Sequence, residues 1–128
     1  MKIKNLLSAV LFLFFASYFA QNTIEVMSFN IRLGSVDDGE NHWNIRKDKV
    51  KDLINYYEAD FVGLQEAQKP QINYLLENNS LYSFLGKPRD DGENSEFSCI
   101  FYLKNKYKVL EQNTFWLSET PEKSTKSW

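Results

Sequence analysis

The sequence predicts an α/β layered domain, and two observations lead to this class. Short apolar, β-branched runs alternate with helical periodicity in the first part of the domain, and a series of strand-like runs follows. The 128 residues allow one domain, and 43% hydrophobic residues with five glycines and three prolines is an ordinary globular composition. Strands that alternate with helices pack as layers of sheet and helix.

The first half of the domain is predicted to run strand, helix, strand, helix. Residues 24–31 form a strand, and residues 34–41 form a loop because they are rich in turn residues. A helix follows from Asn44, its expected N-cap, and residues 60–64 form the second strand. Pro70 suits the first turn of the second helix. The buried helix faces are expected to be Val50, Leu53, Ile54 and Tyr57, then Ile72, Leu75 and Leu76.

The second half is predicted to consist of strands at residues 82–85, 97–103, 107–110 and 114–117. Cys99 lies within the second of these runs and is expected to be a packed thiol, because no histidine lies close in sequence to activate it. A single cysteine excludes an internal disulfide framework and a cysteine-based zinc site.

The first twenty residues differ from the rest of the chain. Lys2 and Lys4 precede an apolar run from Leu6 to Ala20, a pattern typical of a secretory signal peptide. The run is short for a membrane-spanning helix, which needs about 20 apolar residues. A cleaved signal peptide is therefore favoured over the alternatives, an uncleaved anchor or a buried helix. We therefore expect a signal peptide at 1–20, a domain at 21–128, and a secreted or periplasmic protein without a stable membrane anchor.

The charge of the chain disfavours a nucleic-acid-binding module. The formal net charge is −2, and it becomes −4 when residues 1–20 with their two lysines are removed. Proteins that bind polyanions through bulk charge carry a basic excess, and no basic stripe is present in this sequence.

Two polar residues stand at the ends of predicted strands. Asn30 follows the apolar run of the first strand, and Glu66 comes at the end of the second. Ligands bind at the carboxyl ends of strands in α/β sheets, and amide and carboxylate oxygens are suited to a hard divalent cation. A structural asparagine and a glutamate that serves a helix cap would explain the same pattern. From the pattern alone, both interpretations stay open.

Two motifs resemble those of a known superfamily. Residues 27–32 (Met-Ser-Phe-Asn-Ile-Arg) and 62–67 (Val-Gly-Leu-Gln-Glu-Ala) resemble the first two motifs of the endonuclease/exonuclease/phosphatase superfamily, which includes DNase I. The resemblance to a secreted bacterial branch extends through residues 38–41, 89–92, 96–97, 100–102 and 115–121. It covers residues 24–128 and implies the N-terminal half of a DNase I-like four-layer α/β/β/α sandwich.

The resemblance also implies a chemistry and a set of site residues. Glu66 would bind catalytic Mg²⁺ or Mn²⁺, and Asn30 would help to hold the metal and the phosphate. Glu96 matches a carboxylate that steadies a catalytic histidine in DNase I-like proteins. The implied reaction is hydrolysis of a phosphoester by metal-activated water. The Arg89 guanidinium would suit a substrate phosphate, although a loop salt bridge with Asp90 or Asp91 explains it equally well.

Other parts of the family's machinery have no counterpart in the sequence. The Gly-Asp-x-Asn and Ser-Asp-His motifs are absent, and the only histidine, His42, lies in a predicted loop. We therefore expect a fragment that is inactive alone and leaves one face of its sheet uncovered. The alternative is a non-catalytic truncated product or an interaction module that keeps half the fold. The substrate stays open among nucleic acid, sugar phosphate and lipid head group.

Overall fold

A computed structural model describes residues 23–125 and contains one four-stranded mixed sheet. Its strands are β1 (Val26–Asn30), β2 (Phe61–Gln68), β3 (Tyr82–Leu85) and β4 (Glu96–Leu103). They lie in the order β1-β2-β4-β3, with β1 parallel to β2 and the other two pairs antiparallel. The sheet and its helices confirm the mixed α/β class that the sequence predicts.

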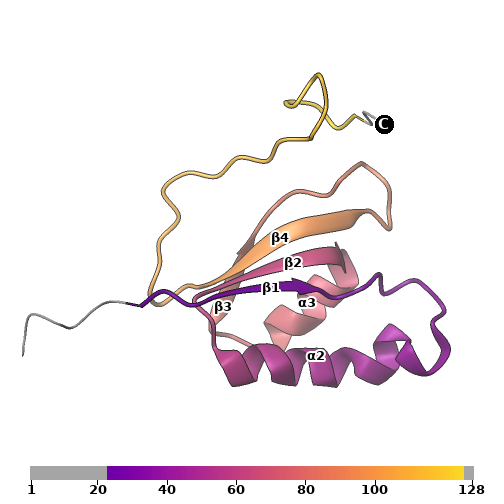
Figure 1. The fold of residues 1–128 in the computed structure, drawn as a ribbon, viewed down its shortest axis with the longest axis vertical. Coiled ribbons are helices and arrows are strands. Elements are labelled where there is room, and N and C mark those ends of the chain that lie inside the picture. Colours follow the sequence, from indigo (N-terminus) through magenta and orange to yellow (C-terminus); the bar gives the residue numbers. More distant parts are fainter. Residues whose placement is uncertain (1–22, 126–128) are drawn as a thin grey trace, which may run out of the picture.

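Two helices lie on the same side of the sheet (Figure 1). Helix α2 (Trp43–Tyr57) follows a short 3₁₀ helix, η2 (Gly39–Asn41), and begins two residues earlier than an N-cap at Asn44 implies. Its N-cap is His42, whose Nδ1 accepts a hydrogen bond from the backbone N–H of Asn44 at 3.2 Å, so the predicted Asn44 cap is wrong. Helix α3 (Lys69–Glu77) has proline in its first turn, as predicted.

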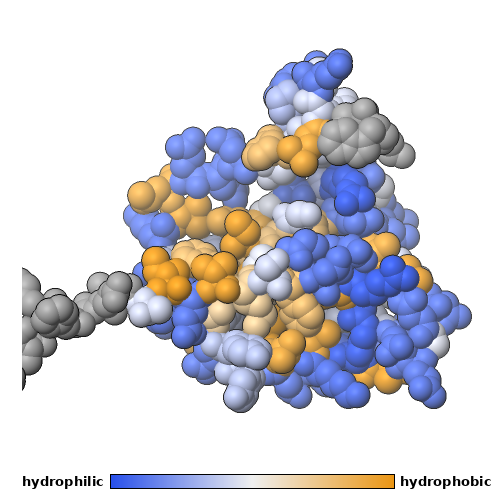
Figure 2. Space-filling model, in the orientation of Figure 1, coloured by the Kyte–Doolittle hydropathy of each residue, from blue (hydrophilic) through white to orange (hydrophobic). Residues whose placement is uncertain are grey.

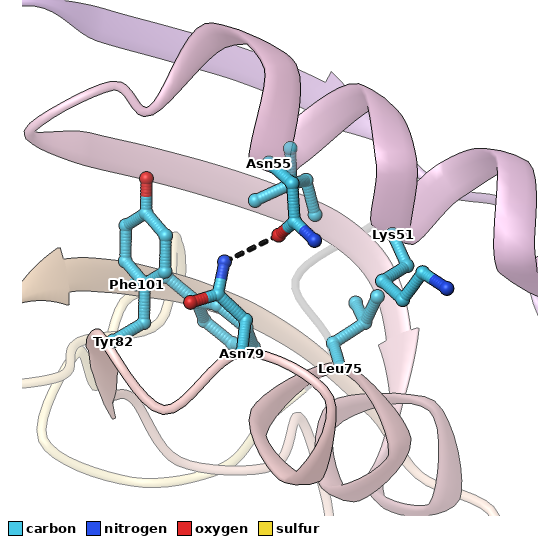
Figure 3. A pocket seen from close by; sticks show the side chains of 7 residues that line it. Lys51, Asn55, Leu75, Asn79, Tyr82 and Phe101 are labelled. Atoms are coloured by element: carbon cyan, nitrogen blue, oxygen red, sulfur yellow. Dashed lines mark hydrogen bonds between the residues drawn. The ribbon is translucent and has the colours of Figure 1, made fainter.

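The core lies between the sheet and the helices. Alternate residues of β2 and β4 point into it, because successive side chains of a strand point to opposite faces. Its most deeply buried large apolar side chains are Ile31, Ile54, Val62, Leu64, Ile72, Leu75 and Phe101. Figure 3 shows one end of this core, where Asn79 Nδ2 donates a hydrogen bond to Asn55 Oδ1 beside Tyr82 and Phe101.

Within residues 23–125, no helix lies on the opposite face of the sheet. The chain after β4 leaves on this side (Figure 1), and in Figure 2 hydrophobic surface gathers around the end of the sheet where β1 begins. Val26 and Ile100 are among the exposed apolar side chains on the strands. The Phe61 and Tyr107 rings contact each other, with their centroids 4.5 Å apart.

The two strands predicted at 107–110 and 114–117 are wrong, since both segments lack regular structure. A strand needs a neighbour to pair with, and neither segment pairs with β1 or β3, the two edge strands of the sheet. Part of the apolar surface of these segments stays exposed: the Leu110 side chain is 91% exposed, whereas Tyr107 packs against the core.

Asp60, which directly precedes β2, forms hydrogen bonds to the segments that contain Glu25 and Lys106. Its carboxylate accepts hydrogen bonds from the backbone N–H of Glu25 at 2.9 Å and from Lys106 Nζ at 3.0 Å. These two donors, the backbone N–H first, hold the pKa of Asp60 below its usual value. Because the folded pKa is lowered, Asp60 stabilises the fold fully above its unfolded pKa of about 3.9, and this contribution is lost as the pH falls through the folded pKa.

We expect Asp60→Asn to lower the free energy of unfolding at pH 7, because the amide keeps an acceptor but loses the ion pair with Lys106. Urea unfolding of both proteins from pH 7 to pH 2 measures the difference. The gap should stay constant down to about pH 4 and close below it, where the Asp60 carboxylate is protonated. A gap that is equally large at every pH would contradict this account.

No helix within residues 23–125 is long and apolar enough to cross a membrane. The signal peptide expected at 1–20 lies outside the described residues.

Candidate functional site

Asn30 and Glu66 meet where β1 and β2 end. These strands are parallel and pair in register up to Asn30 opposite Gln65, so both polar side chains reach the same edge of the sheet. Asn30 Nδ2 donates a hydrogen bond to Glu66 Oε1 at 2.9 Å. The predicted juxtaposition is therefore present in the structure.

Glu66 is not the last residue of its strand. Strand β2 continues to Gln68, and its register with β4 is interrupted between Leu64 and Ala67. Glu66 occupies this interruption with a φ of 55°, in the left-handed region that non-glycine residues rarely adopt. Irregularities of this kind redirect a side chain within a strand. The sequence placed Glu66 at the correct edge but gave no sign of the interruption.

The second carboxylate oxygen of Glu66 has no hydrogen-bond partner among the described residues, although the oxygen is buried. The nearest cationic group is Arg32, whose Nη1 lies 3.9 Å from it. The Asn30 amide, followed by the nearby backbone N–H of Leu33 and then the charges of Arg32 and Arg89, holds the pKa of Glu66 below its usual value. The group is thus an anion at neutral pH with one unsatisfied oxygen, which is costly unless a ligand completes it.

Arg89 and Glu96 form an ion pair next to this edge. Glu96 begins β4 opposite Gln68 of β2, and its Oε2 lies 3.1 Å from Arg89 Nη2. The backbone N–H of Arg89 also donates to the Glu96 carbonyl at 2.8 Å. The salt bridge that the structure shows for Arg89 is with Glu96, which the sequence analysis had not considered as its partner. The Arg89 side chain stays 63% exposed, so its guanidinium is accessible to an anion.

Arg32 is a site residue that the sequence analysis did not single out. It follows Asn30 by two residues, adopts a φ of 58°, and binds both carboxylate oxygens of Asp38 at 3.0 and 3.2 Å. Its hydrogen bond holds the pKa of Asp38 below its usual value. An arginine and an aspartate six residues apart, across a turn-rich loop, were the available signal. Arg32 adds a second cationic group beside Glu66.

His42 and Cys99 take no part in this site. The ring of His42 caps α2, as described above. Burial raises the pKa of the Cys99 thiol to about 12, so the reactive thiolate is not populated at neutral pH. No cluster of three or more His, Cys, Asp or Glu side chains arranged to hold a metal occurs within the described part of the chain.

A hollow of about 300 Å³ lies elsewhere, at the other end of α3. It is lined by Asn55, Glu58, Asn78, Asn79, Ser80 and Leu81. It contains one ionisable side chain and none of the sequence-predicted residues. The unsatisfied carboxylate therefore marks the candidate site better than the size of a hollow does.

Solved structures resemble this chain closely. An endonuclease/exonuclease/phosphatase from Bacteroides vulgatus is 39% identical, with a TM-score of 0.77 over 82% of this chain and 41% of its own. A mannosyl-6-phosphatase from Bacteroides thetaiotaomicron is 33% identical, with a TM-score of 0.77 over 83% of this chain and 41% of its own. This chain thus spans about two fifths of the length of either structure.

A more distant structure, the 2′,3′-cyclic phosphatase ANGEL2, is 23% identical, with a TM-score of 0.63 over 75% of this chain and 32% of its own, and shares the fold. Comparison with curated proteins gives no match. The sequence profile of the Endonuclease/Exonuclease/phosphatase family matches residues 27–122, which include Asn30, Glu66, Arg89 and Glu96. The chain therefore belongs to the endonuclease/exonuclease/phosphatase family.

Proposed function

We propose that this chain supplies the metal-binding half of an exported, divalent-metal-dependent phosphoesterase. The observation that carries the proposal is the Glu66 carboxylate, which has one oxygen held by Asn30 and the other buried without a hydrogen-bond partner among residues 23–125. A buried anionic oxygen of this kind is suited to a cation. The 33%-identical mannosyl-6-phosphatase and the family membership support phosphoester hydrolysis as the reaction.

The residues present fit Mg²⁺ or Mn²⁺. Mg²⁺ is commonly held by one or two carboxylates and keeps several waters, so a single glutamate with an amide beside it is a sufficient protein contribution. Glu66 would be the metal ligand. Asn30 orients it by donating to Oε1, and would offer its oxygen to the metal or an amide N–H to the phosphate. When bound, the metal would stabilise charge on the phosphoryl oxygens and lower the pKa of a bound water.

The remaining site residues provide the setting for a phosphate. The Arg89 guanidinium is exposed and would bind phosphate oxygens, as charge-assisted pairs of this type do. Glu96 holds Arg89 in place at 3.1 Å. A role for Glu96 in steadying a catalytic histidine requires a histidine from outside residues 23–125, because His42 caps α2.

The rest of the proposal concerns the larger protein. Residues 1–20 would be a signal peptide that directs the domain at 21–128 to the periplasm or outside the cell, with no stable membrane anchor. The uncovered sheet face would receive a second sheet and complete a four-layer α/β/β/α sandwich. Because the chain spans two fifths of its structural neighbours, we propose that turnover requires the missing C-terminal half. Sugar phosphate monoesters are the first substrates to test, given the mannosyl-6-phosphatase.

Titration of the 128-residue chain with Mn²⁺ tests the proposal. The electron paramagnetic resonance signal of free Mn²⁺ should disappear until a single site is filled, and added Mg²⁺ should restore it by competition. A chain that takes up no Mn²⁺ would favour the non-catalytic product or interaction module instead. The same preparation is then offered mannose 6-phosphate and bis(4-nitrophenyl) phosphate. Hydrolysis by these residues alone would contradict the proposed need for the C-terminal half.

A further inference from the structure

Behind the candidate site lies a buried glutamine on α3. The Gln71 side chain is polar but only 1% exposed, because it lies on the helix face that also buries Ile72 and Leu75. Its Nε2 donates to the Arg32 carbonyl at 2.9 Å, and its Oε1 accepts from the backbone N–H groups of Gly34 and Gln68 at 3.1 and 2.9 Å. One amide thus binds the loop after β1 and the start of α3 together.

The bonds of Gln71 continue to the carboxylate. Gln71 holds the Arg32 carbonyl, and the backbone N–H of the same Arg32 donates to Asn30 Oδ1 at 2.9 Å. That bond sets which way the Asn30 amide faces, and its Nδ2 then donates to Glu66 Oε1 at 2.9 Å. Three successive hydrogen bonds therefore lead from Gln71 to Glu66. Rotation of the Asn30 amide would break two of them.

The loop is shaped for this contact. A Cβ atom built on Gly34 would lie 2.9 Å from Gln71 Cδ and 3.0 Å from its Cγ, which is closer than non-bonded carbon atoms normally approach each other. Only glycine lets the backbone rest on the amide at this point. The left-handed conformation of Arg32 is likewise opposed by sterics and needs surrounding bonds to hold it. Arg46 Nη2 supplies a second such bond to the Arg32 carbonyl at 3.1 Å.

A second buried glutamine extends the same arrangement to the other loop of the site. Gln68 Oε1 accepts from the backbone N–H of Ser35 at 2.9 Å, and its Nε2 donates to the Asn94 carbonyl at 2.8 Å. Asn94 belongs to the loop between β3 and β4, which also contains Arg89. The two loops that flank Glu66 are thus joined through side chains and not through a direct backbone ladder.

We propose that Gln71 is a positioning residue that fixes the Asn30 amide, and through it the Glu66 carboxylate, in the orientation needed for the metal. This inference rests on the proposed metal site and adds a residue that acts on it from behind. Groups that orient a metal ligand change metal affinity by about 10–100-fold when they are removed. Gln71 never contacts the metal in this account.

The direct test observes Asn30 without metal. In the 128-residue chain, the side-chain amide resonances of Asn30 are compared between wild type, Gln71→Met and Gly34→Ala. The second variant keeps every hydrogen-bonding group and displaces Gln71 with one methyl group, so it guards against loss of the fold. Glu66→Ala supplies the reference in which Asn30 has no acceptor. We expect both variants to move the Asn30 resonances toward that reference.

The matched control is Leu75→Ala, which perturbs the same helix at a buried apolar side chain. It should destabilise the fold while leaving the Asn30 resonances and the Mn²⁺ affinity as in wild type. Gln71→Met and Gly34→Ala should weaken Mn²⁺ binding at least about tenfold. Asn30 resonances that stay at their wild-type positions in both variants would overturn the inference. A wild-type chain that binds no Mn²⁺ would instead contradict the proposed function, and the Asn30 resonances would still decide the positioning role.

Discussion

Glu66→Ala should abolish Mn²⁺ binding by the 128-residue chain. The substitution removes the anionic group that would bind the metal directly, so the loss should exceed the roughly 100-fold upper range seen for groups that only orient a ligand. Glu66→Gln keeps the size of the side chain and an acceptor for Asn30 but removes the charge, and we expect nearly the same loss. The measurement is the concentration of free Mn²⁺ at equilibrium, read from its paramagnetic resonance signal.

Glu77→Ala is the control for this experiment. Glu77 is an exposed glutamate at the last residue of α3, so its removal subtracts the same charge at a distance from the proposed site. Its Mn²⁺ affinity should match that of wild type. Undiminished binding by both Glu66 variants would remove Glu66 from the metal site, and an equal loss in Glu77→Ala would indicate a general effect of net charge.

Phe101→Ala should cause the largest loss of stability among single substitutions in the sheet. The side chain is 1% exposed on β4, which pairs with a strand on each side, and its ring packs near those of Tyr82 and Phe84. Truncation of a buried phenylalanine to alanine costs about 3–5 kcal/mol, through lost apolar burial and the cavity that remains. Urea unfolding measures the change in the free energy of unfolding.

The adjacent residue provides the comparison. Ile100 points to the uncovered face and is 46% exposed, so Ile100→Ala should cost well under half as much as Phe101→Ala. A similar cost for the two would mean that the face without helices is covered in solution. In a longer protein in which a second sheet packs there, we expect the cost of Ile100→Ala to rise toward that of a core position.

Local pattern was sufficient for the elements that are held together by their own apolar faces. The bounds of β3 are those predicted, and α3 has proline in its first turn and Ile72 and Leu75 in the core. The face expected for α2 is only half correct, because Val50 and Ile54 are buried but Leu53 and Tyr57 are exposed. Cys99 is buried, as its place in an apolar strand indicated. The predicted strands at 107–110 and 114–117 failed because strand propensity does not provide a partner, and neither segment pairs with the edge strands β1 and β3.

The site was predictable in its residues and not in its geometry. The rule that parallel strands end at one edge predicted that Asn30 and Glu66 lie close together. In the structure Asn30 Nδ2 lies 2.9 Å from Glu66 Oε1, and the role of the two residues in metal binding stays a prediction. The left-handed conformation of Glu66 depends on a register interruption between β2 and β4, which no local pattern encodes. Gln71 left one signal: a polar residue on the buried face of a predicted helix needs partners there.

The order of strands also constrains how the chain can fold as it is synthesised. Strand β4 follows β2 and β3 in sequence, yet it lies between them, so β3 has no partner and β2 has only β1 until residue 103 has emerged from the ribosome. Before that point only the β1–β2 pair can form, and it joins segments about 35 residues apart, a long loop to close. The nascent chain therefore leaves the edge of β2 that pairs with β4 without a partner while residues 69–103 are synthesised. Such a chain is a natural client for chaperones that bind unpaired apolar strands.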